Sequence, residues 1–349
     1  MLRTIYAEQH KLHATETVTY EGHPFITHEA PARVESILRA VQAANLGPII
    51  TPTDYGLDPI LAVHDADFVE FLRTIYDRSA AALPQTQPVF PSTFATRYTG
   101  RKPKHLVGLA GYFAFGSGSP ILAGTWAAAY WSAQCALTAA VDLLGGAGAV
   151  YALCRPPGHH AAANLYGGFC YLNNAAIAAR YLQTAPRGDA QAKVAVLDSD
   201  YHHGNGTQAI FYADPSVLYC SLHAHPDDEY PYYWGQADER GAGEGEGCNR
   251  NWPLPPGTDD ARYLAALDEA LAAIRDYGPH YLVVSAGFDL VAGDPEGGFT
   301  VTQAGLREIA RRISGLGLPV VIVQEGGYLL ESLGESTAAF LQAFIELGR

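Results

Sequence analysis

The sequence predicts an α/β fold in which a central, mostly parallel β-sheet is covered by helices on both faces. Short runs that are apolar almost throughout recur along the chain, and this pattern is typical of strands buried on both faces. Turn residues and then an amphipathic segment with helical spacing follow most of these runs. Strands that alternate with helices in this way are usually parallel, because a crossover helix returns the chain to the same edge of the sheet.

Five predicted strands share this apolar and often β-branched composition and lie at residues 150–154, 193–197, 217–222, 281–285 and 319–323. Four amphipathic helices are predicted, at about 125–144, from the Thr258 cap to Gly278-Pro279, from near Thr302 to before Gly317, and at about 336–347. The stretch at about 79–119 is different, because it is rich in Pro, Gly, Ser and Thr and has no sustained period. We therefore expect a single domain over residues 1–349 with a long loop insertion at about 79–119.

The composition argues against several classes of protein. The chain has 349 residues, of which 48% are hydrophobic, so it can bury a large core. Its formal net charge of -14 argues against a nucleic-acid partner, since phosphate binding needs clustered Lys and Arg. Five cysteines without a CxxC pair favour free thiols, and the sequence shows neither a signal-peptide core nor a bilayer-spanning apolar run. We expect a soluble, cytoplasmic protein with no membrane partner.

Residues 197–207, which read LDSDYHHGNGT, place acids and histidines at the end of a predicted buried strand. Asp198, Asp200 and His202 alternate, so their side chains share one face of an extended backbone. Carboxylate and imidazole groups suit zinc, and the carboxyl end of a parallel strand is where α/β folds place their sites. A polar strand end satisfied by hydrogen bonds is the alternative for this segment taken alone.

Another acid, Asp289, lies just beyond the predicted strand at 281–285. Together with Asp200 and His202 it would give three protein ligands and leave a fourth position for water. That arrangement is typical of a catalytic zinc site rather than a structural one. Taken alone, Asp289 could equally be a helix cap or a turn residue.

Two further loops carry groups suited to acid–base chemistry. The loop RPPGHH holds His159 and His160 as a tandem pair in a turn fixed by Pro and Gly, which favours a role in proton transfer. The loop EGGY presents Tyr328 after a glycine turn, and a phenol can donate a hydrogen bond to an oxyanion. Ordinary packing is the alternative for each loop considered by itself.

The motifs RPPGHH, GGFCYLNN, LDSDYHHGNGTQ, SLH, SAGFD and EGGY, in this order, resemble the histone deacetylase superfamily. The N-terminal segments YAEQHKLH and APARVESIL are most similar to the bacterial acetylpolyamine amidohydrolases and histone deacetylase-like amidohydrolases. The resemblance covers essentially the whole chain. It implies the arginase/deacetylase-like fold, a three-layer α/β/α arrangement with a central, mostly parallel sheet.

The resemblance also implies which residues bind metal ions. It assigns Asp200, His202 and Asp289 as the ligands of one zinc ion per chain, for which Fe²⁺ or Co²⁺ could substitute. A structural potassium ion would be held by Asp198 and Ser221.

Catalytic roles follow from the same resemblance. His159 matches the histidine that hydrogen-bonds an aspartate, here Asp198. His160 matches the general base and acid, which Asn205 would orient. Tyr328 matches the tyrosine that stabilises the transition state.

Gly168, Phe169 and Tyr230 match positions that line the family's narrow substrate tunnel. This chain departs from the acetylpolyamine enzymes in one respect, because those carry acids in the loop before the GTW segment. Here no acid occurs from Lys102 to Thr125, so the charge that would attract a polyamine is missing from that loop.

Negative charge could come instead from the acids that precede Tyr230, namely Asp227, Asp228 and Glu229. The alternative is that these three residues are an ordinary solvated loop.

The implied reaction is the removal of an acetyl or other short acyl group from N-acylated amines such as acetylpolyamines. The alternatives are an acetyl-lysine deacetylase acting on proteins, a deacylase or amidase of neutral or aryl amides, and a non-enzymatic binder of acylated ligands. An arginase-like ureohydrolase would share the fold but would need two metal ions. The resemblance also implies a homodimer formed through the insertion at about 79–119.

Overall fold

The computed structural model describes residues 1–20, 23–95, 101–185 and 191–346. An eight-stranded sheet has the order β4-β1-β5-β10-β9-β6-β7-β8, and every pair of neighbouring strands in it is parallel. Its strands are β1 (Arg3–Ile5), β4 (Ile49–Ile50), β5 (Ala149–Ala152), β6 (Val194–Asp198), β7 (Val217–Ala224), β8 (Asn249–Leu254), β9 (Tyr281–Ala286) and β10 (Val320–Gln324). A separate antiparallel hairpin joins β2 (Thr17–Tyr20) to β3 (His23–Ile26).

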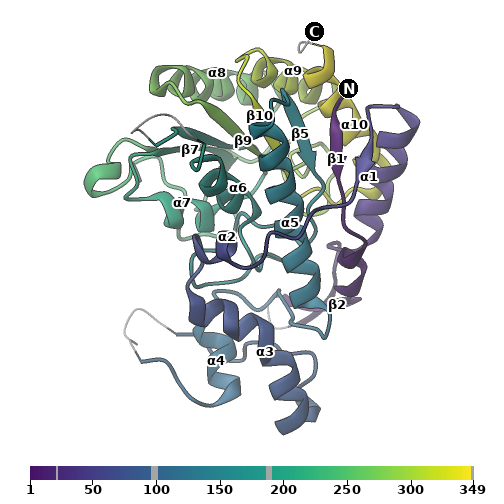
Figure 1. Ribbon diagram of the computed structural model, residues 1–349, viewed down its shortest axis with the longest axis vertical. Helices are drawn as coiled ribbons and strands as arrows, with labels where there is room; N and C mark the ends of the chain where they lie inside the picture. The colour runs from purple at the N-terminus through teal and green to yellow at the C-terminus, as the bar shows by residue number, and fades with distance from the viewer. Residues whose placement is uncertain (21–22, 96–100, 186–190, 347–349) are drawn as a thin grey trace.

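Helices cover both faces of this sheet, so the predicted three-layer α/β/α fold is confirmed (Figure 1). One face carries α5 (Thr125–Leu144) and α6 (Asn174–Leu182), and the core beneath them continues into α3 (Ala66–Ala82) and α4 (Leu106–Tyr112). The other face carries α1 (Ala32–Ala43), α8 (Asp260–Tyr277), α9 (Gln303–Ser314) and α10 (Leu330–Glu346). Shorter elements are α2 (Asp58–Leu61), α7 (Asn205–Phe211) and the 3-10 turns η1 (Glu8–Leu12), η2 (Pro84–Thr86) and η3 (Gly243–Gly245).

The strands are apolar throughout because each one supplies both cores. Along β10, Val321 and Val323 belong to the core beneath α5 and α6. Val320 and Ile322 belong to the core beneath α9 and α10. Successive side chains of a strand point to opposite faces, so a strand buried on both faces cannot alternate with polar residues.

All five predicted strands are present, and the helix predicted at 125–144 is α5. The helix expected to be capped by Thr258 is α8. Its cap is the next residue, Asp259, whose carboxylate accepts the capping hydrogen bond from Arg262 N–H. The last helix begins at Leu330, earlier than predicted, and its expected final residue, Leu347, lies outside the described residues. Gly334 lies inside α10, where the missing side chain lets the helix approach the backbone of α1 at Ser36.

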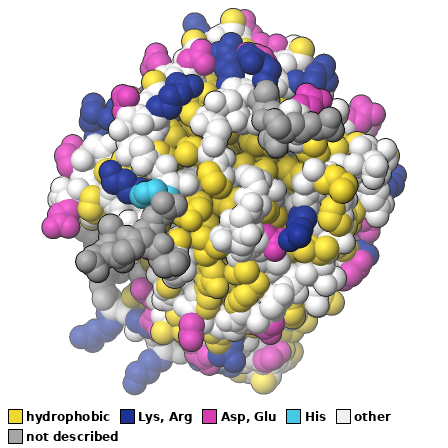
Figure 2. Space-filling view, turned by 45° about the horizontal axis from the view of Figure 1, so that its top comes forward, with side chains coloured by type: hydrophobic (Ala, Val, Ile, Leu, Met, Phe, Trp, Pro, Cys, Tyr) yellow, Lys and Arg dark blue, Asp and Glu magenta, His cyan; other side chains and the backbone are white. Residues whose placement is uncertain are grey.

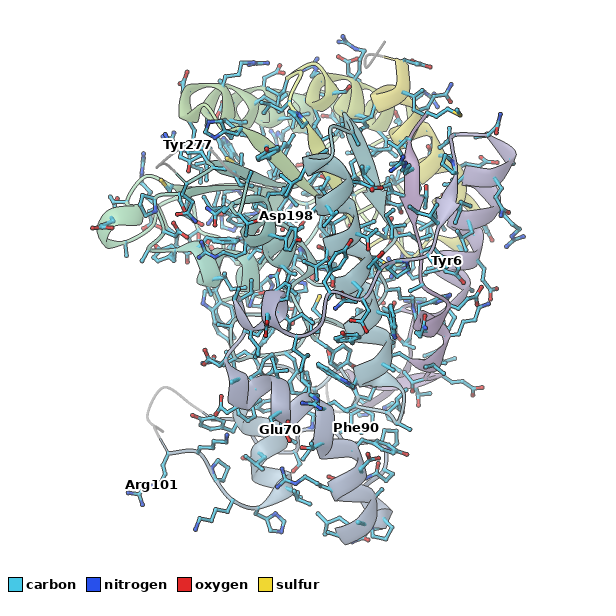
Figure 3. The ribbon with its side chains drawn as sticks, viewed as in Figure 1. Tyr6, Glu70, Phe90, Arg101, Asp198 and Tyr277 are labelled. Atoms are coloured by element: carbon cyan, nitrogen blue, oxygen red, sulfur yellow. The ribbon has the colours of Figure 1, made fainter. Side chains whose placement is uncertain are left out.

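The insertion at about 79–119 is more ordered than its composition predicts. It contains the end of α3 and all of α4, and it extends below the main body together with the rest of α3 (Figure 1). Phe113 explains this order, because its ring packs against Phe71 at 4.8 Å and Phe68 at 5.6 Å between ring centroids. Figure 3 shows Glu70, Phe90 and Arg101 in this extension and Asp198 in the main body. Residues 96–100 lie outside the described residues.

The loops after β5, β6, β9 and β10 carry the predicted zinc ligands, the tandem histidines and Tyr328. These strands lie next to one another in the order β5-β10-β9-β6, so their carboxyl ends meet at one edge. Within the described part of the chain, no helix combines the length and apolar character that crossing a membrane would require.

Three histidines outside this edge are held in the neutral form. His10, His13 and His64 are buried, and burial lowers the pKa of each to about 4. His64 Nε2 accepts a hydrogen bond from the backbone N–H of Asn173 at 2.9 Å, which requires an unprotonated nitrogen. In the unfolded chain these imidazoles titrate near their ordinary value of about 6.5.

We expect the free energy of unfolding to fall as the pH drops from about 6.5 toward 4, because only the unfolded chain binds protons at these imidazoles in that window. Denaturant titrations across the window measure the slope. His64→Gln keeps an acceptor for Asn173 but cannot titrate, so its stability should depend less steeply on pH. An identical slope in the variant and the wild type would contradict the assignment.

Candidate active site

Asp200, His202 and Asp289 converge on one point at the carboxyl edge of the sheet. Their ligand atoms all lie within 4.8 Å of one another, and both carboxylates are fully buried. His202 Nδ1 lies 3.2 Å from Asp289 Oδ2 and 3.4 Å from Asp200 Oδ1. A single metal ion with two carboxylate oxygens and one imidazole nitrogen fits this donor set and leaves a further coordination position open.

The convergence comes from a turn and not from an extended strand, which corrects the expectation of alternating side chains. β6 ends at Asp198. Asp198 Oδ1 accepts a hydrogen bond from Asp200 N–H at 3.2 Å, and Asp200 Oδ1 accepts one from His202 N–H at 3.0 Å. Such side-chain turns are a known preference of aspartate, and here two of them in succession fold the ligands toward β9.

The charges of the site also fit a cation. Burial opposes protonation of His202, but Asp200 and Asp289 outweigh it and raise the pKa of His202 well above its ordinary value. The two carboxylates therefore favour a positive charge between them. Gly326 shapes the same space, because a Cβ at that position would collide with the carboxylates of Asp289 and Asp200.

A second group of metal-ligand residue types, His159, Cys170 and Glu325, does not fit a metal ion. The Nδ1 of His159 is hydrogen-bonded to Asp198, and both carboxylate oxygens of Glu325 accept hydrogen bonds. Burial raises the pKa of Cys170 well above its usual range, whereas a metal ligand must be a thiolate. These three residues are hydrogen-bonding or packing groups behind the first site.

The tandem histidines are held by different partners. His159 Nδ1 lies 3.1 Å from Asp198 Oδ2, and His160 Nδ1 lies 2.7 Å from the Asn205 amide oxygen. An amide oxygen only accepts, so His160 must donate through Nδ1–H and keep a lone pair on Nε2. Burial lowers the pKa of His160 well below its ordinary value, and the neighbouring His159 and His202 lower it further. Its neutral form suits a general base.

Tyr328 is buried on the turn after β10. Asp294 Oδ2 accepts hydrogen bonds from the backbone N–H of Tyr328 at 2.6 Å and of Leu329 at 2.9 Å. The Arg33 guanidinium lies over the phenol ring, 4.6 Å from its centroid, and donates to Gly327 O at 2.6 Å. Burial raises the pKa of Tyr328 well above its usual value, so its hydroxyl remains a donor at neutral pH.

These groups line a single pocket of about 510 Å³. His159, His160, His202 and Tyr328 all border it, and so do all three predicted tunnel residues, Gly168, Phe169 and Tyr230. Asn205, Asp198, Asp200 and Asp289 lie behind this lining, where they hold or accompany the residues that face the pocket.

The wall at Gly168 and Phe169 has an unusual backbone. Both residues have positive φ, at 55° and 66°, and a Cβ at Gly168 would collide with the His160 ring. A positive φ is unfavourable for a phenylalanine. The Ser119 hydroxyl accepts a hydrogen bond from Phe169 N–H at 2.8 Å and helps to hold this conformation. The wall can therefore lie close to the His160 ring.

Comparison with known proteins identifies the family of this chain. The family model described as "Histone deacetylase domain" matches residues 27–344. The chain belongs to the histone deacetylase family. It is 42% identical over 345 residues to acetylpolyamine amidohydrolase 1 of Pseudomonas aeruginosa and 43% identical over 345 residues to acetylpolyamine amidohydrolase of Burkholderia pseudomallei, with 98% of each chain covered in both cases. The crystal structure of acetylpolyamine aminohydrolase from Burkholderia pseudomallei superposes with a TM-score of 0.94 at 41% identity, covering 99% of both chains.

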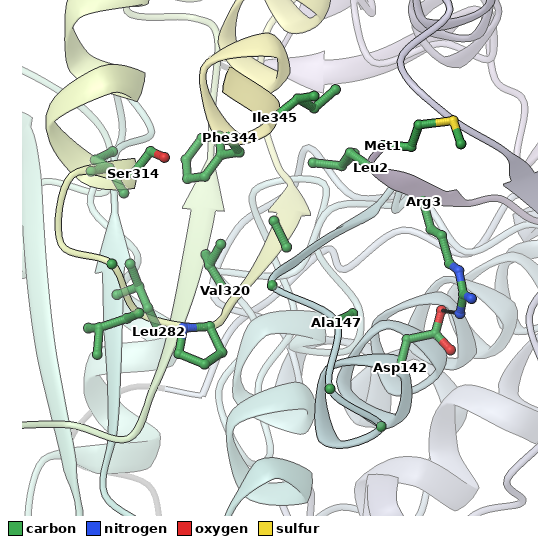
Figure 4. A pocket seen from close by; sticks show the side chains of 18 of the residues that line it. Met1, Leu2, Arg3, Asp142, Ala147, Leu282, Ser314, Val320, Phe344 and Ile345 are labelled. Carbon is green, nitrogen blue, oxygen red and sulfur yellow. Dashed lines mark ion pairs between the residues drawn. The ribbon is translucent and has the colours of Figure 1, made fainter. Parts of the chain in front are cut away.

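This member of the histone deacetylase family has a larger cavity, of about 840 Å³, at the opposite edge of the sheet. It lies at the amino ends of β1, β5 and β10, and Arg3 and Asp142 form an ion pair 3.1 Å long in its wall (Figure 4). Figure 2 views the molecule toward the end where the termini lie, and shows hydrophobic side chains among scattered charges of both signs. None of the predicted catalytic or metal-binding residues borders this cavity.

Several residues at the deacetylase-family pocket were missed in the sequence. Val18 and Phe25 come from the β2–β3 hairpin, and Glu296 lies in the loop after Asp289. Phe115 stacks against Tyr230 with ring centroids 6.1 Å apart. No local pattern announces these residues, because they reach the pocket only through the tertiary fold.

Proposed function

We propose that this protein is a zinc-dependent amidohydrolase that removes acetyl or other short acyl groups from N-acylated amines, with acetylpolyamines as its leading substrate class. The observation that carries the proposal is the convergence of three metal-ligand side chains, a neutral histidine and a buried tyrosine around one pocket. The family and its relatives support the reaction, since both are named for the hydrolysis of acylated amines.

Asp200, His202 and Asp289 would hold the zinc ion, and Fe²⁺ or Co²⁺ could take its place. When bound there, the ion supplies a Lewis acid that polarises the amide carbonyl and activates the attacking water. Asp198 and Ser221 are proposed to help hold a structural potassium ion deeper in the fold; they lie opposite each other on the neighbouring strands β6 and β7.

The chain's own residues account for the proton transfers. His160 Nε2 accepts a proton from the attacking water, because Nδ1–H is committed to Asn205. The Tyr328 hydroxyl donates a hydrogen bond to the oxygen that becomes negatively charged when the carbonyl is attacked. His160 then returns its proton to the amine nitrogen, since an amine anion cannot leave. His159 orients the adjacent loop through Asp198.

The charge of the pocket favours substrates that carry an ammonium group. Among the described residues that line it, Glu229 and Glu296 are acidic and none is Lys or Arg. Glu229 accepts hydrogen bonds from the Tyr201 hydroxyl at 3.2 Å and from Tyr230 N–H at 2.9 Å. Glu296 lies 2.6 Å from His28 Nδ1. These two carboxylates would replace the acids that the loop before the GTW segment lacks.

A substrate panel tests the proposal. We expect catalytic efficiency to be higher for acetylputrescine and acetylspermidine than for acetyl-lysine peptides and neutral aryl amides. Glu229→Gln and Glu296→Gln should each raise KM for the polyamines about tenfold, the value of one charge-assisted hydrogen bond, and leave KM for the neutral amides unchanged.

Asp227→Asn is the matched control, because Asp227 is an exposed acid near Glu229 that does not border the pocket. It should leave every KM unchanged. Preference for neutral amides in the wild type, or equal KM changes for charged and neutral substrates in the glutamate variants, would overturn the assignment of the substrate class.

We also propose an oligomeric state and a place of action for this enzyme. The extension formed around residues 79–119 would make the contact of a homodimer, and Phe115 at its end would join that contact to the pocket wall. We propose that the whole chain acts as one catalytic domain in the cytoplasm on small acylated amines, without nucleic-acid or membrane partners.

A further inference from the structure

Glu325 is a fully buried carboxylate that takes no part in the proton transfers described above. It follows β10 directly and lies three residues before Tyr328. Its Oε2 accepts hydrogen bonds from the backbone N–H groups of Gly158 at 2.6 Å and His159 at 3.1 Å. Its Oε1 accepts one from the Ser285 hydroxyl at 3.1 Å. A carboxylate with this many donors is fully satisfied and fixed in place.

The backbone of Glu325 is as firmly held as its side chain. Its N–H donates to Ala286 O on β9 at 2.9 Å. Its carbonyl accepts a hydrogen bond from Arg33 Nη2 at 2.6 Å. The backbone is hydrogen-bonded to the sheet on one side and to α1 on the other, so the side chain extends from a fixed position. We call the Glu325 side chain with its hydrogen bonds the strut.

This strut joins the two loops that carry the reacting side chains. At one end it holds the peptide groups immediately before His160. At the other end it begins the turn that carries Tyr328. The side-chain bond of His160 to Asn205 fixes the rotation of the ring, but it does not fix the position of the backbone that carries the ring.

We infer that Glu325 is a positioning residue for catalysis, which sets the distance between His160 on one loop and Tyr328 on the other. The inference rests on the roles proposed for those two residues. A misplacement of about 1 Å of a catalytic group can lower the rate about 10²-fold, so a rigid connection between the loops has a kinetic effect.

Two substitutions at this position separate hydrogen bonding from charge. Glu325→Ala removes every acceptor and leaves two buried N–H groups without a partner. Glu325→Gln can turn its carbonyl oxygen to Gly158 and His159 and its amide nitrogen to Ser285, whose hydroxyl can also accept. We expect kcat to fall about 10- to 100-fold in Glu325→Ala and to stay within about threefold of the wild type in Glu325→Gln.

The expected loss is in kcat and not in KM, because Glu325 does not border the pocket. Turnover should be measured on the metal-loaded enzyme and divided by the folded fraction, so that lost stability is not counted as lost catalysis. If Glu325→Ala does not fold, Glu325→Asp provides the same test, since its carboxylate is one methylene too short to reach both loops.

Ser285→Ala is the matched control, because it removes one hydrogen bond of the same carboxylate and spares both loops. Its kcat should equal that of the wild type.

Three results would overturn the inference: an unchanged kcat in Glu325→Ala, an equal loss in Glu325→Gln, or a loss confined to KM. Failure of the proposed function would be recognised separately, because wild-type turnover in a Tyr328→Phe variant would remove the role of Tyr328 whatever happens at Glu325.

Discussion

Replacing Tyr328 by phenylalanine is expected to lower kcat about 10²–10³-fold, which is the usual cost of losing one hydrogen-bond donor to an oxyanion. The ring itself should stay in place. It packs beneath Arg33, and its backbone N–H donates to Asp294, and neither contact needs the hydroxyl. The variant should therefore fold, bind its metal ion in the same amount as the wild type, and retain KM while it loses turnover.

Tyr166→Phe is the matched control for this variant. Tyr166 is also a buried tyrosine, but it does not border the pocket, and its hydroxyl makes only a 3.5 Å contact with Ala110 O. Steady-state kinetics and metal analysis of both variants would distinguish a chemical role from a packing role. Wild-type turnover in Tyr328→Phe, or an equal loss in both variants, would contradict the role proposed for Tyr328.

The sequence was most informative where local pattern and tertiary position coincide. The strands could be predicted because burial on both faces leaves them apolar throughout, as along β10. Asp200 and Asp289 could be predicted as neighbours because both follow such strands, and the carboxyl ends of parallel strands meet. The family's motifs then supplied roles that neither burial nor spacing could assign.

The sequence was least informative for residues whose packing or hydrogen-bonding partners lie far away in the chain. The extension at 79–119 appeared irregular because its order depends on packing against α3 and not on a repeating pattern of its own. Asp294 and Glu325 resemble ordinary acids of a turn. Asp294, however, accepts hydrogen bonds from two backbone N–H groups of the Tyr328 turn, and Glu325 accepts two from the loop of the tandem histidines. Asp294 and Glu325 thus hold the backbone around the candidate site, although neither is a predicted metal ligand or proton carrier.

Glu29 is another buried acid that holds distant parts of the chain together, and we expect it to contribute more to the free energy of unfolding. It is a buried carboxylate between two buried arginines, and it accepts hydrogen bonds from Arg33 Nη1 at 3.1 Å, Arg155 Nε at 2.8 Å and Arg155 Nη2 at 2.9 Å. Burial alone would raise the pKa of Glu29, but Arg155 and Arg33 outweigh it and lower that pKa. Arg155 begins the loop of the tandem histidines, and Arg33 holds the turn of Tyr328 through Gly327 O.

Glu29→Gln is therefore expected to lower the free energy of unfolding by about 3–5 kcal/mol, which is typical when one partner of a buried ion pair is removed. The substitution keeps the volume of the side chain but leaves two buried guanidinium groups without the carboxylate charge that is paired with both of them. Denaturant unfolding of the two proteins at neutral pH measures the difference. If Glu29→Gln unfolds at the same denaturant concentration as the wild type, the arginines find other partners and the prediction is wrong.

Glu308 provides a matched control for burial, because it also accepts hydrogen bonds from two arginines, Arg311 and Arg312. Those pairs are exposed to solvent or only partly covered by the protein. Water screens them, so Glu308→Gln should cost far less stability than Glu29→Gln although both changes break the same kinds of bond. Equal losses would mean that the energy comes from hydrogen bonding alone. The buried charge of Glu29 would then have no special part in joining α1 to the loops that carry the tandem histidines and Tyr328.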